Sequence, residues 1–163
     1  MQNIEELPFV QDLVLTPTSD AIFNEDFGNM GVAINNPIHI GEKFLSFCKE
    51  NLNCKVMDIG CANGYPVSIP ALSLNAEVTC LDGDPPRIEE LKRTVEAMDL
   101  DKSKAKIMCE FYPLTKEKIT NDNTLGYYDA IFTSRTIHCG DAEHYKRCLE
   151  CIYDQLKTNG TLF

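Results

Sequence analysis

The chain has 163 residues, of which 44% are hydrophobic and 25% are charged. This length and composition predict one globular domain with a sizeable core, and they exclude a disordered or low-complexity protein. The formal net charge of −10 argues against a protein that binds nucleic acid through a broad basic surface.

Cysteine usage and the first residues indicate the compartment. Several of the eight cysteines stand in apolar runs, as Cys80 does in 78–81, which is typical of buried free thiols. The beginning of the chain has no basic segment followed by an apolar one, and no apolar run is long enough to cross a bilayer. We therefore expect a cytoplasmic protein with reduced thiols and no membrane partner.

The chain divides at about residue 39. Prolines and glycines punctuate residues 1–39 irregularly, which predicts an N-terminal arm or lid. Residues 40–163 are regular and form the expected domain. Its first helix ends near Asn51 and places four residues on its buried face, namely Ile40, Phe44, Phe47 and Cys48.

Strand and helix patterns then alternate. Apolar runs predict strands at 54–59, 77–81, 106–109 and 129–133, and the start of a fifth at 161–163. Helices are predicted at 66–74, after a cap at Asp84, and weakly at 113–126. Pro70 is compatible with the first of these helices only if that helix begins late. The alternation predicts an α/β fold, a parallel sheet with helices on both faces.

The last predicted helix follows Asp141, whose side chain can cap its first turn. Helical spacing gives it a buried face of four residues: Tyr145, Leu149, Ile152 and Leu156. The pair Asn159-Gly160 is a typical helix end, so we expect the helix to reach that point.

The strongest chemical signal is the run 56–65. A buried strand leads into a turn with small residues at Gly60, Ala62 and Gly64. Small residues let a backbone approach a ligand closely, and the following helix offers free N–H groups. Asp58 lies at the end of the strand, where its carboxylate can face an amino group.

Two further runs carry polar residues at strand ends. Asp82 ends the next strand, 18 residues after Gly64, and a carboxylate there can accept hydrogen bonds from both ribose hydroxyls of an adenosine ligand. The run 128–138 opens a strand with an aspartate and ends it in a polar loop. A dinucleotide motif would need a small residue where Tyr65 stands, which argues against a nicotinamide or flavin cofactor.

Taken in order, these runs resemble motifs I, II and IV of the class I, Rossmann-like, S-adenosylmethionine-dependent methyltransferases. The run 156–162 resembles the turn before the fifth strand of that family. The resemblance covers residues 40–163, with Ala62 in place of the usual middle glycine of motif I. It implies an S-adenosylmethionine-binding methyltransferase domain that uses S-adenosylmethionine and forms S-adenosylhomocysteine.

The resemblance also implies the site. The cofactor-binding residues would be Asp58, Gly60, Cys61, Ala62, Gly64, Asp82, Gly83, Glu110, Phe111 and Thr133. By its position after the fourth strand, His138 would be the catalytic base, and Arg135 would hold an acidic group of the acceptor. Motif IV has neither an Asn-Pro-Pro-Tyr-like run nor a Pro-Cys pair. These absences argue against methylation of amino groups in DNA or glutamine and of cytosine C5. Because the net charge is strongly negative, the expected acceptor is a small molecule or a protein side chain.

A cluster of histidines and cysteines near residue 140 has the residue types of a metal site. The pair Cys148 and Cys151 stands alone, however, without the second pair that a structural zinc site needs. Cys148 also fits the buried side of the last helix. We expect no metal in this set, which comprises His138, Cys139, His144, Cys148 and Cys151.

The family sheet has seven strands, whereas this sequence reaches only the fifth. A class I topology truncated after strand 5, with strands 6 and 7 absent, would leave an unpaired edge and bare apolar surface. We expect a dimer or an additional C-terminal segment to cover that edge. The alternative function is a methyltransferase-like module that binds the cofactor or a partner without turnover.

Overall fold

The computed structural model describes residues 37–65, 67–134, 136–137 and 140–163. Its centre is one parallel sheet in the order β3-β2-β1-β4-β5. The strands are β1 Lys55–Ile59, β2 Glu77–Asp82, β3 Ala105–Cys109, β4 Tyr128–Thr133 and β5 Leu156–Leu162. The predicted α/β class is confirmed. The strand order reverses direction between β1 and β4, and open parallel sheets bind ligands beyond the carboxyl ends of strands at such a point.

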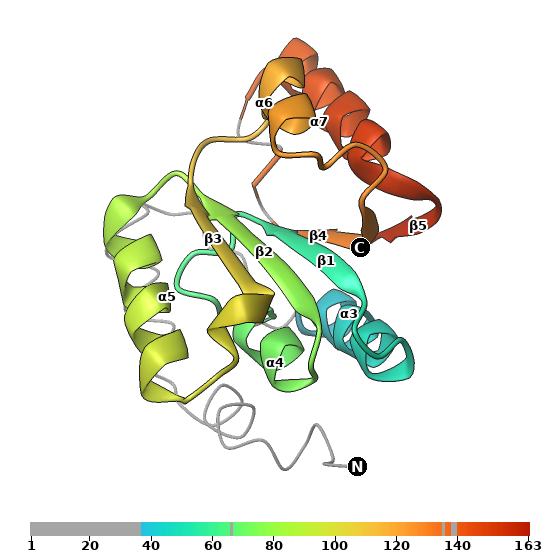
Figure 1. The fold of residues 1–163 in the computed structure, drawn as a ribbon. Helices are drawn as coiled ribbons and strands as arrows, with labels where there is room; N and C mark the ends of the chain where they lie inside the picture. Colours follow the sequence, from blue (N-terminus) through green and yellow to red (C-terminus); the bar gives the residue numbers. More distant parts are fainter. Residues whose placement is uncertain (1–36, 66, 135, 138–139) are drawn as a thin grey trace.

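Helices cover both faces of the sheet, as Figure 1 shows. The cluster of buried residues on one face takes in α3, α4 and α5, and the cluster on the other face takes in α6 and α7. The helices are α3 Pro37–Glu50, α4 Ser68–Ser73, α5 Pro85–Ala97, α6 Lys116–Asn121 and α7 Ala142–Gln155, with a short 3-10 turn at Lys102–Lys104.

The central strand β1 is buried on both faces. Val56 packs in the cluster with α3, α4 and α5, while Met57 and Ile59 pack in the cluster with α6 and α7. A strand covered on both faces has to be apolar almost throughout. Apart from the half-buried Lys55 at its start, the exception in β1 is Asp58, whose place near the carboxyl end of the strand positions it for the site.

The helix ends follow the proline positions. Helix α4 begins at Ser68, so Pro70 falls in the first turn, where its missing N–H breaks no helical hydrogen bond. The expected late start is confirmed. The expected side-chain cap at Asp84 is wrong. Asp84 precedes α5 but makes no capping hydrogen bond, and its carboxylate pairs with Arg87 at 3.2 Å instead.

The predicted buried face of α7 is right only in part, because Ile152 is buried as expected but two other members are not. Tyr145 is 44% exposed and Leu149 is 36% exposed, whereas the buried residues are Cys148, Cys151, Ile152 and Gln155. Thiols behave as apolar groups in a core. The Gln155 amide is satisfied inside the protein, because it accepts from Tyr112 and donates to Thr124, each at 3.1 Å.

Helix α7 is also shorter than expected. It ends at Gln155, and Leu156 has the extended backbone that begins β5, so Asn159-Gly160 lies within a strand. The expected cap is confirmed, because the Asp141 carboxylate accepts a hydrogen bond from the His144 amide at 2.7 Å.

The buried face of the first helix, α3, agrees with the prediction in part. Ile40 is 47% exposed, while Phe44 and Cys48 are buried as predicted.

Of the predicted arm, residues 1–36 lie outside the described residues. The part of the chain that the structure describes contains no helix that could span a membrane, and within it β5 pairs only with β4.

Candidate functional site

The Asp82 carboxylate joins two loops at the carboxyl edge of the sheet. Its Oδ2 accepts a hydrogen bond from the Ala62 amide at 2.9 Å, and its Oδ1 accepts one from the Asp84 amide at 2.9 Å. Ala62 belongs to the turn after β1, and Asp84 to the turn after β2. The two strand ends that the sequence singled out therefore meet, with Asp82 between them.

The turn after β1 is held against β2 by backbone hydrogen bonds. The amides of Gly60 and Cys61 donate to the Leu81 carbonyl at 2.7 and 3.1 Å. The turn contains three residues with positive φ: 78° at Gly60, 49° at Ala62 and 91° at Gly64. Glycine accepts this left-handed region readily, while alanine adopts it at a cost of about 1 kcal/mol.

Small residues in this turn are needed by the protein's own packing. A side chain at Gly64 would overlap Leu91 of α5 and crowd Ile69 of α4, and one at Gly60 would overlap Thr136. From the sequence, both glycines were expected to allow close approach of a ligand. The structure adds that helix packing and the segment after β4 already require them.

Asp58 is a buried carboxyl group, only 3% exposed. Its Oδ2 accepts a hydrogen bond from the Ser68 hydroxyl, at the start of α4, at 2.5 Å. Burial raises the pKa of Asp58 to about 7, with a further contribution from the charge of Asp82, while the Ser68 hydrogen bond acts in the opposite direction. A carboxyl group with such a pKa changes its charge near neutral pH.

The two candidates after β3 point to different places. The Glu110 carboxylate pairs with Lys118 of α6 at 2.9 Å, so it is already engaged beside α6. The Phe111 side chain is 82% exposed, yet its ring lies directly over Gly83, where a side chain would overlap it. Of the two side chains, only that of Phe111 therefore lies over the Asp82 turn, although the Glu110 backbone amide donates to the Asp82 carbonyl at 3.0 Å.

Thr133 ends β4, directly beside the end of β1, where it is in register with Ile59. Its amide donates to the Phe163 carbonyl at 3.0 Å. Its hydroxyl oxygen is buried and has no hydrogen-bond partner among the described residues. Buried hydroxyls are usually hydrogen-bonded, so that of Thr133 has the capacity to bond a ligand. Arg135 and His138, the expected acceptor and base residues, lie outside the described residues.

Two residues near the site were not among the site residues predicted from the sequence. Ser68, the partner of Asp58, stands as a polar residue at the start of a short apolar helix, and that position was a usable signal. Thr136 fills the space beside Gly60, and no local pattern indicates such a contact between distant segments.

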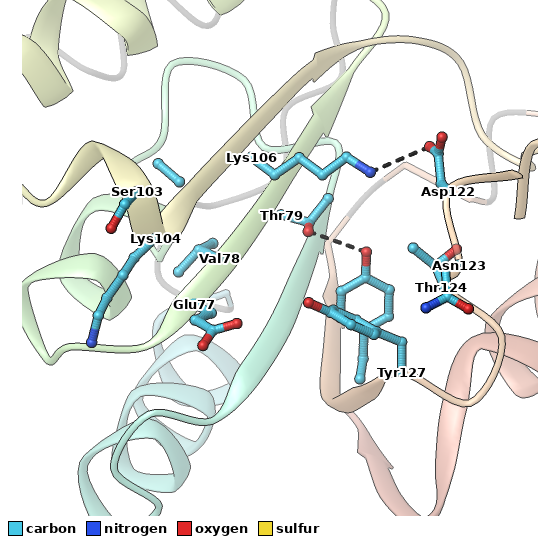
Figure 2. Close-up of a pocket in the computed structure, with 12 residues that line it drawn as sticks. Glu77, Val78, Thr79, Ser103, Lys104, Lys106, Asp122, Asn123, Thr124 and Tyr127 are labelled. Carbon is cyan, nitrogen blue, oxygen red and sulfur yellow. Dashed lines mark hydrogen bonds and ion pairs between the residues drawn. The ribbon is translucent and has the colours of Figure 1, made fainter.

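A pocket of about 310 Å³ lies at the opposite, amino edge of the sheet, lined by the first residues of β2, β3 and β4 (Figure 2). Two pairs of its polar groups interact with each other. Lys106 contacts Asp122 at 3.3 Å, and the Tyr128 hydroxyl donates to Thr79 at 3.1 Å. The pocket is therefore separate from the strand ends that carry the candidate residues.

The histidine and cysteine set does not gather into a metal site among the described residues. Cys148 lies 3.4 Å from His144, while Cys151 contacts the Leu114 carbonyl and the Gln155 side chain. The remaining two members, His138 and Cys139, lie outside the described part of the chain.

Comparisons with known proteins agree with this geometry. An S-adenosylmethionine-dependent methyltransferase from Agrobacterium tumefaciens is 21% identical with a TM-score of 0.61, over 81% of this chain and 45% of that one. Precorrin-6y C5,15-methyltransferase from Geobacter metallireducens is 17% identical with a TM-score of 0.56, over 76% and 59%. PKMT2 from Rickettsia typhi, solved with AdoHcy, is 19% identical with a TM-score of 0.53, over 68% and 20%.

At these identities the solved structures show the shared fold, and the chain spans about half the length of the first two. No curated protein matched the sequence. A family model described as methyltransferase domain matches residues 57–163, which is well over half of the chain. The chain therefore belongs to the methyltransferase domain family and has its Rossmann-like α/β fold.

Proposed function

We propose that the protein binds S-adenosylmethionine at the carboxyl edge of its sheet and transfers the methyl group to a small molecule or a protein side chain. The observation that carries this proposal is the position of Asp82, whose carboxylate holds the turn after β1 against the turn after β2. A ligand lying across these two turns meets the carboxylate and the small-residue loop together.

The donors and acceptors present fit the ribose of that cofactor. Each Asp82 oxygen accepts one amide hydrogen bond and keeps a further lone pair. Two adjacent acceptor oxygens match the two adjacent hydroxyls of a ribose, as in other nucleotide sites of this fold type. The exposed Phe111 ring beside Gly83 offers an apolar surface for a flat adenine ring.

The groups at the ends of β1 and β4 fit the methionine part. Asp58 supplies a carboxyl group for the ammonium, and Thr133 supplies a buried hydroxyl that lacks a partner among the described residues. The remaining cofactor candidates are Glu110 and four residues of the turn after β1: Gly60, Cys61, Ala62 and Gly64.

When bound, the cofactor supplies an activated methyl group on a positively charged sulfur. The protein's part is to hold that group in line with an acceptor atom and to exclude water. Thr136, two residues before His138 in the sequence, lies against Gly60 of the turn after β1, which supports a role for the segment after β4. His138 and Arg135, within the same segment in the sequence, remain the proposed base and acceptor-binding residues.

Replacing Asp82 tests the proposed site. Removal of two charge-assisted hydrogen bonds predicts a loss of affinity of about 100-fold or more, so Asp82→Ala should bind S-adenosylhomocysteine far more weakly than wild type in calorimetric titration. Glu150→Ala is the matched control, because Glu150 is an exposed carboxylate on α7. Circular dichroism should show that both variants are folded.

Normal affinity in folded Asp82→Ala would contradict the ribose assignment, and tight binding of NAD would contradict the cofactor. The alternative, a module that binds without turnover, predicts the same titration. It differs in one assay: incubation with S-adenosylmethionine and a panel of amines, thiols and peptides should release S-adenosylhomocysteine only if the protein is an enzyme.

A further inference from the structure

The surroundings of Asp58 determine whether its carboxyl group is protonated or ionised. The carboxyl group lies buried at the end of β1 and accepts a hydrogen bond from Ser68 of α4. One hydroxyl compensates a buried carboxylate poorly, since carboxylates that stay ionised in proteins usually accept two or three donors or face a cation. The neutral, protonated form is therefore favoured more strongly here than in water.

The titratable groups that face Asp58 among the described residues add no positive charge. Cys80 is its partner in register on β2, and Asp82 lies two residues further along that strand. Cys61, in the turn after β1, lies close enough for the charge of Asp58 to contribute to the raised pKa of its thiol. On the other side the partner in β4 is Phe132.

The two neighbouring carboxylates consequently differ. Asp82 accepts hydrogen bonds from two backbone amides, whereas burial and the charge of Asp82 raise the pKa of Asp58 to about 7. Near neutral pH the ligand-free protein is a mixture of molecules with a protonated and an ionised Asp58. An ammonium group brought beside Asp58 would stabilise the ionised form alone.

We propose that S-adenosyl ligands bind the ionised form of Asp58 and release its proton to solvent, so that their affinity rises with pH across the neutral range. This inference rests on the proposed function. The reaction is an exchange without bond formation to the ligand: the Asp58 carboxyl group loses one proton, and the resulting carboxylate pairs with the ligand's ammonium group.

The expected size of the effect follows from the ionised fraction. If only ionised molecules bind, the apparent affinity scales with that fraction. A group with a pKa of about 7 is roughly 10% ionised at pH 6 and roughly 90% at pH 8. Affinity should therefore increase about tenfold from pH 6 to pH 8, and the proton release should fall from about 0.9 to about 0.1 per ligand.

The experiment is calorimetric titration of the whole chain with S-adenosylhomocysteine at pH 6, 7 and 8. Each pH uses two buffers with different heats of ionisation, because the difference in observed heat gives the number of protons released. This ligand carries the ammonium group without the charged sulfur. 5′-Methylthioadenosine, which has no ammonium group, is the control ligand and should bind without releasing a proton from Asp58.

Three variants assign the proton to Asp58. Asp58→Asn should bind with a weak affinity that no longer changes with pH. Ser68→Ala removes the hydrogen bond that favours ionisation, so the midpoint of its affinity profile should move to higher pH. Ser73→Ala is the matched control, because Ser73 lies on the same helix and bonds the Ile69 carbonyl at 3.1 Å instead; its profile should equal wild type.

The results separate this inference from the proposed function. Binding of S-adenosylhomocysteine with a pH-independent affinity and no proton release would overturn the inference and leave the proposed function standing. Proton release that persists in Asp58→Asn would overturn it too. If neither S-adenosyl ligand binds at any pH, the proposed function itself is wrong.

Discussion

At the scale of single residues, two aspartates one strand apart have different physical roles. Asp82 is braced by two backbone amides and ties the turns after β1 and β2 together. Asp58 is buried with a hydroxyl partner. Residue type and spacing in the sequence could indicate that both lie at strand ends. They could not indicate this difference, which arises from the amides and helix that surround each carboxyl group.

The burial of Asp58 predicts an unusual effect on stability. Its pKa in the folded protein is about 7, above the ordinary 3.8, so its contribution to stability is greatest below pH 3.8 and is lost as pH rises towards 7. Asp58→Asn should therefore raise the free energy of unfolding by about 2–4 kcal/mol at pH 8 and by about 1 kcal/mol at pH 4.5. Urea denaturation at both pH values measures this difference.

Glu150→Gln is the control for this comparison, since Glu150 is exposed and lies 3.9 Å from Lys146. Its effect should stay within about 0.5 kcal/mol at both pH values. A loss of stability in Asp58→Asn at pH 8 would mean that the folded protein compensates the ionised carboxylate well, and the raised pKa of Asp58 would then be wrong.

At the scale of elements, the strands were predictable and the helix faces were less so. Buried parallel strands are short apolar runs, and the first four lie within one residue of the predicted ends. The face of α7 was predicted only in part: Ile152 is buried as expected, but Tyr145 and Leu149 are outside, while two cysteines and Gln155 are buried. Which face of an amphipathic helix is buried depends on the partners it meets, and here Tyr112 and Thr124 satisfy the glutamine.

Two alanine substitutions test the face of α7. Ile152 packs in the core with α6, so Ile152→Ala should lower the free energy of unfolding by about 2–4 kcal/mol. Tyr145 is 44% exposed, so Tyr145→Ala should lower it by less than about 1 kcal/mol. Equal losses in denaturant titration, or a larger loss at Tyr145, would favour the face that the helical spacing predicted.

At the scale of the whole molecule, the layered α/β fold followed from the alternation of strand and helix patterns. The meeting of the strand ends at Asp82 followed from parallel strands sharing one edge. Contacts between distant segments did not follow, because no local pattern encodes them. The clearest cases are Thr136 filling the space at Gly60 and Phe111 covering Gly83. The pocket at the amino edge had no sequence signal either.

A crystal structure of this chain with S-adenosylhomocysteine would locate the ligand and so decide whether the carboxyl edge of the sheet is the binding site. We expect both ribose hydroxyls to contact the Asp82 carboxylate, with the adenine beside Phe111 and the ammonium facing Asp58. A ligand found instead in the pocket between Thr79 and Tyr127 at the amino edge, or a ribose out of reach of Asp82, would contradict the proposed site.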